Sequence, residues 1–168
     1  MITTPVGIDV EIQRQQQRLA AKLWTGKNYE SYGHAFINVK EDGSNVPEVF
    51  VNNIDYKDVL TDDKNDAISF FIVDDNMSGN SMAMSVDVKL YFIVNLAKIY
   101  PTLTHRAVEE SHRDALIYIL QHNNVTDIVT GAKALRDFNI PQYQTDMQPY
   151  HAFCLTLEMN YQYDSNCL

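Results

Sequence analysis

The chain has 168 residues, of which 45% are hydrophobic and 21% charged, and its formal net charge at pH 7 is −9. This composition excludes a wholly disordered chain, so we expect a single domain over 1–168, with flexible termini at 1–7 and 164–168. No run approaches the roughly 20 apolar residues that span a bilayer, and the first residues lack the pattern of a secretory signal. Both features predict a protein made in a cytoplasm, without membrane contact.

The negative charge is concentrated in residues 41–75, which hold ten acidic residues against Lys57 and Lys64. Proteins that bind nucleic acid tightly neutralise phosphates with lysine and arginine. The acidic balance therefore excludes a conventional DNA-binding domain, although DNA could pass such a surface without adhering to it. The spacing of the acids does not fit an EF-hand calcium loop.

The helical period of the apolar residues predicts a first helix over about 9–24, with Asp9 as its N-cap and Gly26 after its end. Its apolar stripe consists of Ile8, Ile12, Leu19 and Leu23. The polar residues expected to lie largely outside this stripe are Arg14, Gln15, Gln17, Arg18 and Lys22. The helix is therefore predicted to be amphipathic, with a solvated glutamine-rich face.

Four extended segments follow, over 34–40, 48–53, 67–75 and 84–95. The small and polar residues 76–83 predict a hairpin loop between the last two. The segment 84–95 alternates most clearly, because every second residue is apolar. The residues on that face are Met84, Val86, Val88, Leu90, Phe92 and Val94.

The second half of the chain predicts a helix over about 104–122, a short strand or turn at 126–131 and a helical turn or two at 132–138. The apolar stripe of this second helix is Val108, His112, Ala115, Leu116, Ile119 and Leu120. A long final strand over 150–164 places one set of residues on a common face: His151, Phe153, Leu155, Leu157, Met159, Tyr161 and Tyr163. Cys154 and Cys167 support neither a disulfide framework nor a four-ligand zinc site, and both are expected to be inert.

This order of elements is not the strand–helix alternation of a doubly wound fold. Long strands with one apolar and one polar face predict an α+β fold, in which two main α-helices pack on one face of an antiparallel β-sheet. The polar face of the sheet is then expected to meet water or another subunit.

His105, Glu109 and His112 raise the question of a metal site, because their spacing places them on one side of a helix. Two imidazoles and a carboxylate suit zinc or iron. However, no second helix offers matching ligands, and the neighbouring arginines can pair with the glutamates as Arg106–Glu109, Arg106–Glu110 and Glu110–Arg113. We interpret these residues as helix surface and expect no metal and no cofactor, with a small metal-dependent enzyme as the alternative.

No pattern for a catalytic nucleophile or for nucleotide binding occurs in the sequence, and we expect no enzymatic activity. Ten tyrosines and long polar faces instead favour contacts between subunits, because the tyrosine ring is apolar and its tip polar. The residues expected at such interfaces are Asn76, Met77, Ser78, Gly79, Asn80, Arg106, Glu110, Arg113, Thr156, Glu158 and Asn160.

After the N-terminal helix come "SVDVKLYFIVN", "LAKIYPTLTHRAVEESHRDALIYIL" and "QPYHAFCLTLEMNYQY". In this order, over about 8–163, the chain resembles the tail-terminator and tail-completion proteins of tailed bacteriophages, which form head–tail joining or neck rings. In the general character of these segments, the chain is also similar to ring proteins of crAss-like gut phages.

The resemblance implies a virion protein, made in the host cytoplasm, that forms a homo-oligomeric ring in the neck or tail. Its partners would be other neck, tail and portal-side proteins, and DNA would pass only transiently through the lumen. The family has no catalytic residues to carry over. An acidic lumen would fit this role, because it repels phosphate. An acidic protein that mimics nucleic acid remains a further alternative.

Overall fold

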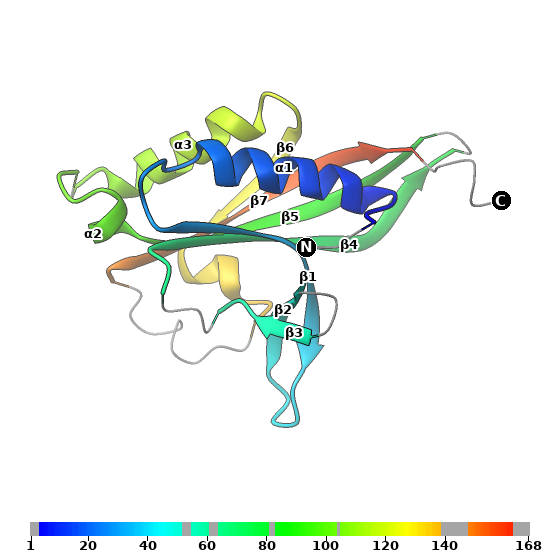
Figure 1. Cartoon of the computed structure of the whole chain (residues 1–168), viewed down its shortest axis with the longest axis horizontal. Helices are drawn as coiled ribbons and strands as arrows, with labels where there is room; N and C mark the ends of the chain where they lie inside the picture. Colours follow the sequence, from blue (N-terminus) through cyan, green and yellow to red (C-terminus); the bar gives the residue numbers. More distant parts are fainter. Residues whose placement is uncertain are drawn as a thin grey trace.

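The computed structural model describes residues 4–51, 55–60, 64–80, 83–103, 105–138 and 148–162. The fold is α+β, as the sequence predicts (Figure 1). The helices are α1 (Ile8–Lys22), α2 (Leu96–Ile99), α3 (Ala107–Ile119) and the 3₁₀ helix η1 (Gly131–Leu135). The strands are β1 (Tyr29–Val39), β2 (Asn45–Val51), β3 (Asp55–Asp58), β4 (Ala67–Gly79), β5 (Met84–Asn95), β6 (Asn124–Thr130) and β7 (Tyr150–Tyr161).

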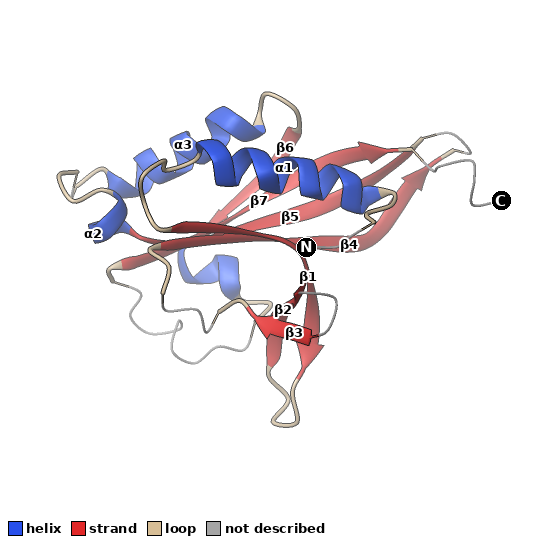
Figure 2. Ribbon diagram, in the orientation of Figure 1, coloured by secondary structure: helices blue, strands red, loops and turns tan. Residues whose placement is uncertain are grey.

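The seven strands form one sheet in the order β3-β2-β1-β4-β5-β7-β6 (Figure 2). All neighbouring pairs of described strands are antiparallel except β1 and β4, which run parallel. The longest ladder joins β5 to β7, where Met84 lies opposite Tyr161 and Asn95 opposite Tyr150. These two strands therefore form the centre on which the helices pack.

The helices α1 and α3 lie on the same face of the sheet, which confirms the prediction of two main helices on one side (Figure 1). Ile12 and Leu19 of α1 and Ile119 of α3 join a buried cluster with the inward residues of β5 and β7. In the middle of this first core, the rings of Phe92 and Phe153 are stacked with centroids 4.6 Å apart. The predicted inward faces of both strands are confirmed, except at Tyr163, which lies outside the described residues.

The opposite face of the sheet is covered in its middle, so the prediction that it meets water or another subunit is wrong there. Phe70, Tyr91 and Phe138 form a second buried cluster, which Ala152 and Cys154 of β7 complete from the strand face expected to be polar. The ring of Phe138 meets those of Tyr91 and Phe70 edge-on, at 5.1 and 5.9 Å between centroids. The segment after η1 therefore closes this side of the sheet.

The strand β1 belongs to two parts of the structure. Its first residues pair with β4, and the register shifts between Ser31 and His34. Beyond that point, from Ala35 onward, β1 pairs with β2, which pairs in turn with β3. These strands project from the rest of the sheet, and we call residues 34–51 and 55–58 the wing (Figure 1). The strand β3 was not predicted.

The predicted apolar stripes of both long helices are buried or half-buried, except at Leu120. The helix α1 begins after Gly7 rather than at Asp9, and Gln15, expected in solvent, is only 4% exposed. In α3, Glu110 is buried, whereas Leu120, expected in the apolar stripe, is 58% exposed. The helix α1 begins one residue before the predicted range 9–24 and ends two residues before its end, and α3 is shorter at both ends than 104–122.

Cys154 is predicted to be unreactive in the folded protein. Its side chain is buried in the second core, and this burial raises the pKa of the thiol to about 12. Because the thiolate is the reactive form, iodoacetamide at pH 8 should leave Cys154 unmodified in the native protein and alkylate it after unfolding in urea. Peptide mass mapping measures both states. Modification at similar rates in the two states would contradict this packing. Cys167 lies outside the described residues.

Candidate functional site

The structure does not bring the predicted trio of His105, Glu109 and His112 together. His105 is exposed in the turn before α3, and Glu109 is exposed on the helix. Among the residues that the structure describes, no group of three histidine, cysteine, aspartate or glutamate side chains could hold a metal ion. The expected helix-surface role therefore describes His105 and Glu109, whereas His112 is half-buried, in agreement with its place in the predicted apolar stripe.

His112 of α3 instead meets His151 of β7. Their Nε2 atoms are 3.0 Å apart, and the ring of His112 also packs edge-on against Phe153 at 4.5 Å between centroids. Burial lowers the pKa of both imidazoles, that of His151 to about 4, and the charge of Glu109 opposes this effect. Both rings are therefore neutral at pH 7. The sequence placed His151 on the inward face of the final strand, but nothing in it indicated that α3 crosses that strand there.

The charged residues predicted at the outer face of α3 are arranged around one carboxylate. Glu110 binds both Arg106, at 3.4 Å, and Arg113, as the three- and four-residue spacings predicted. Arg106 pairs with Glu110 rather than Glu109. The arginine side chains are 62% and 63% exposed, whereas Glu110 is largely buried. Glu110 is therefore not free for an interface, but the two arginines are accessible.

The interface residues predicted in a hairpin loop at 76–83 lie mostly in a strand, because β4 continues to Gly79. The exposed residues at this end of the hairpin are Asn76, Met77, Ser78, Gly79 and Asn80. Asn80 shapes the turn, since its Oδ1 accepts a hydrogen bond of 3.1 Å from the backbone of Ala83. The hydroxyl of Tyr161, the last residue of β7, lies 3.3 Å from the sulfur of Met77.

Gly79→Ala should destabilise this hairpin by about 1–3 kcal/mol. Gly79 has a φ of 155°, and a Cβ there would lie 2.8 Å from the Cα of Met84 and collide with the carbonyl oxygen of Ala83. Gly43→Ala is the control, because Gly43 also has a positive φ, of 81°, but nothing within 4 Å of its added Cβ. Urea denaturation of both variants separates steric collision from backbone strain. Equal losses of stability would contradict the collision.

The polar face of β7 is available only toward the end of the strand. Thr156 and Glu158 lie opposite Asp127 and Asn124 of β6, and the hydroxyl of Ser85 donates a 3.3 Å hydrogen bond to Glu158. These two predicted interface residues are half-buried, and Asn160 is exposed.

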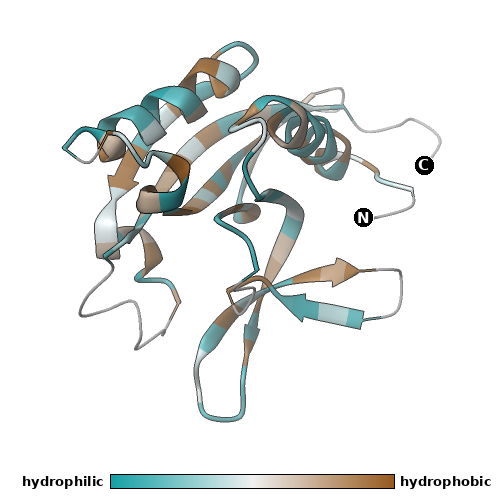
Figure 3. Cartoon of the chain, turned by 60° about the vertical axis from the view of Figure 1, so that its left-hand side comes forward, coloured by the Kyte–Doolittle hydropathy of each residue, from teal (hydrophilic) through white to brown (hydrophobic). Residues whose placement is uncertain are grey.

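Four exposed apolar side chains that the sequence did not single out lie on the wing. Phe36, Ile37, Val39 and Tyr56 are 44–65% exposed. Neighbouring residues of a strand point to opposite faces, so Phe36 and Ile37 make both faces of the wing apolar. Figure 3 shows hydrophobic segments alternating with hydrophilic ones along these strands. The sequence pattern indicated a strand here, but strand periodicity does not reveal that the rest of the sheet turns away from it.

An open groove of about 680 Å³ separates the wing from the rest of the sheet. Residues 34–37 of β1 and Asn45 of β2 line it from the wing. The charged residues that line it from the other side are Asp74, Asp75, Lys89, Arg136 and Asp137. Within this set, Asp137 accepts hydrogen bonds from Lys89 and from the hydroxyl of Tyr91, at 3.5 and 3.1 Å. The groove is therefore lined by charged side chains of both signs, three carboxylates and two cations.

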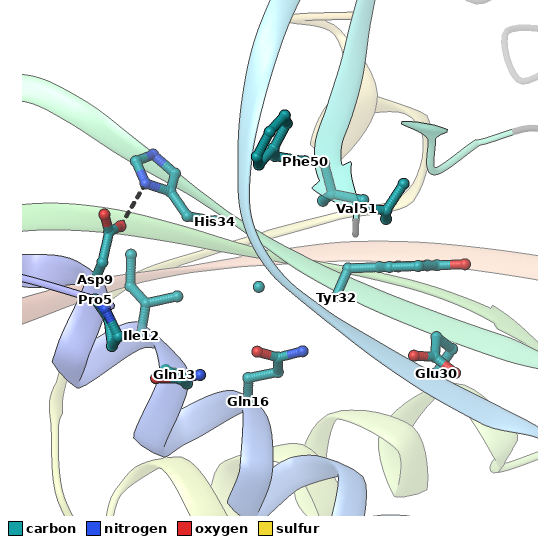
Figure 4. A pocket seen from close by; sticks show the side chains of 12 residues that line it. Pro5, Asp9, Ile12, Gln13, Gln16, Glu30, Tyr32, His34, Phe50 and Val51 are labelled. Carbon is teal, nitrogen blue, oxygen red and sulfur yellow. Dashed lines mark hydrogen bonds and ion pairs between the residues drawn. The ribbon is translucent and has the colours of Figure 1, made fainter. Parts of the chain in front are cut away.

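A smaller cavity of about 200 Å³ lies between α1 and the bend of β1 (Figure 4). His34 Nδ1 and Asp9 Oδ1 pair at its edge, 2.7 Å apart, and Gln16 donates a hydrogen bond of 2.8 Å to the carbonyl of Ser31. Among the described residues, its lining has no serine, threonine, cysteine, lysine or arginine. The pair can therefore orient helix and strand, but it meets no nucleophile in this cavity.

Comparisons with known proteins identify no relative: no family model matches the chain, nor does any curated protein or any solved structure. Within the described part of the chain, no helix has the length and apolar character needed to cross a membrane.

Proposed function

We propose that the protein is a structural subunit that forms a ring in the neck or tail of a tailed bacteriophage and performs no catalysis. The observation that carries the proposal is the wing, whose apolar side chains are exposed on both faces outside the core. Clustered exposed apolar residues with polar surroundings are typical of protein–protein contacts. A head-to-tail contact between identical subunits that closes by rotation generates a ring.

Two further surfaces support contacts on other sides of the subunit. The outer side of α3 carries Arg106 and Arg113, together with the exposed apolar residues Ile117 and Leu120. The far end of the β4–β5 hairpin exposes Met77. We assign these surfaces to neighbouring subunits and to other neck, tail or portal-side proteins of the virion.

The charge of the chain supports a role in which DNA passes but does not bind. The net charge is −9, and the wing carries five acidic residues against Lys40 and Lys57. A ring that presents such a surface to its lumen repels phosphate, which favours transient passage of DNA.

Electron microscopy and light scattering of the purified protein test this function. We expect rings, formed by the protein alone or with the products of neighbouring virion genes. Monomers at every concentration, even with those partners present, would overturn the proposal. The class of the protein is tested independently by whether portal, terminase or tail genes lie beside its gene.

The wing is tested by Val39→Ser, with Val6→Ser as the control. The two valines are 65% and 66% exposed, but Val6 lies before α1 and outside the wing. Both substitutions should change the free energy of unfolding by less than about 0.5 kcal/mol, because the side chains are exposed. Only Val39→Ser should weaken ring assembly in light scattering. Assembly that is unchanged in Val39→Ser and in Phe36→Ser would exclude the wing as the contact.

A further inference from the structure

The two histidines between α3 and β7 have a geometry that suits a metal ion. His112 and His151 approach each other through their Nε2 atoms, 3.0 Å apart, and both rings are half-buried. The ring planes are tilted by 42°, and Phe153 packs against both rings. The two nitrogens that face each other are therefore held by a helix and a strand rather than by loops.

A direct hydrogen bond between the rings requires one Nε2 to be protonated and the other to accept. Zinc bound by both Nε2 atoms requires both lone pairs, with Zn–N distances of about 2.0–2.1 Å. At a tetrahedral angle these distances place the two nitrogens about 3.3 Å apart. The observed distance between the two nitrogens is therefore within about 0.3 Å of the distance across a shared zinc ion.

The chemistry of the donors selects the class of ion. Imidazole nitrogen suits zinc, copper and nickel, whereas calcium and magnesium prefer oxygen ligands. Glu109 precedes His112 by three residues on α3, and its charge acts on both rings. Among the described residues no third donor completes the site, so an ion bound there would have two protein ligands and would take its other ligands from solvent.

We propose that His112 and His151 form a two-histidine site for a divalent transition-metal ion, with zinc as the reference ion. The ion would link α3 to β7 at the edge of the first core. The site goes beyond the proposed ring function and does not depend on it. It also differs from the trio suggested by the sequence, since His151 takes the place of His105.

Zinc chloride is the probe for the full chain without an added histidine tag. Calorimetric titration should show one zinc ion per chain. At a free zinc concentration of about 100 times the dissociation constant, the melting temperature should exceed that in EDTA by about 5–10 °C. No stoichiometric binding, or binding without a thermal shift, would overturn the proposal.

His112→Gln and His151→Gln should each weaken zinc binding at least about tenfold and abolish the thermal shift. His105→Gln and His122→Gln are the controls, because both residues are exposed outside the pair, and they should bind zinc like the unmodified chain. Retained binding in the double variant of His112 and His151, or an equal loss in the controls, would overturn the site.

If a variant fails to fold, imidazole ¹⁵N spectra of the unmodified protein decide. Zinc should shift the Nε2 signals of His112 and His151, and shifts confined to other histidines would refute the assignment.

Discussion

Phe153→Ala is expected to lower the free energy of unfolding by about 3–5 kcal/mol. Phe153 is fully buried in β7, and its ring stacks on Phe92 and meets His112 edge-on. Its removal would leave a cavity beneath α3, at the point where helix and sheet meet. Since a domain of this size is stabilised by about 5–15 kcal/mol, a large share of the stability would be lost.

Urea denaturation at fixed protein concentration measures this effect, because any assembly would make the apparent stability depend on concentration. Phe153→Leu is the matched control, since it retains most of the apolar volume, and its cost should be about 1–2 kcal/mol. A loss below about 1 kcal/mol in Phe153→Ala would mean that α3 does not close over this part of β7.

Phe138→Ala, which tests the second core, is expected to lower the free energy of unfolding by about 3 kcal/mol. Phe138 is 2% exposed and packs edge-on against Tyr91 and Phe70 on the sheet face opposite the helices. Its loss should also raise the exposure of Cys154, which belongs to the same cluster. Denaturation and alkylation of the same variant therefore report on one structural feature by two routes.

Arg136→Ala is the control for this variant, because Arg136 is exposed in the same turn after η1. Arg136→Ala should change the free energy of unfolding by no more than about 0.5 kcal/mol. If Phe138→Ala cost no more than Arg136→Ala, the face would be open to water or to another subunit, as its sequence pattern suggested.

The strands β5 and β7 could be predicted from the sequence because their alternation is nearly uninterrupted. The predicted range 84–95 agrees with β5, and 150–164 ends three residues beyond β7. The fold class followed from these two strands and the helices. The predicted loop at 76–83 was too long, because small polar residues such as Ser78 can continue a strand that is exposed at its end.

The phase of α3 was predicted except at Leu120, but the burial of Glu110 was not, because periodicity treats a charged residue as exposed. Glu110 is buried because Arg106 and Arg113 neutralise it from the solvent side. Leu120 follows the last residue of α3 and is exposed, whereas His112, which the predicted stripe includes, reaches β7. The candidate metal pair depends on a contact between residues 39 positions apart, which no local pattern indicates.

The wing and the second core were missed for a related reason. The strand β3 consists of Asp55, Tyr56, Lys57 and Asp58 and has no apolar alternation to reveal it. Phe138 follows a short 3₁₀ helix, and nothing local indicates that it reaches Tyr91. Such contacts depend on how distant segments meet, which one sequence does not encode in any local period.

The order of the sheet places β3 and β6 at its two outer positions, and both strands disfavour uncontrolled strand addition. The strand β3 has only four residues and begins and ends with an aspartate. The strand β6 is interrupted by a register shift between Val125 and Asp127. Short, charged and bulged edges resist pairing with other chains and so limit aggregation. Subunits that lie close together are therefore not expected to associate by adding strands to each other's sheets. We expect them to associate through exposed side chains instead.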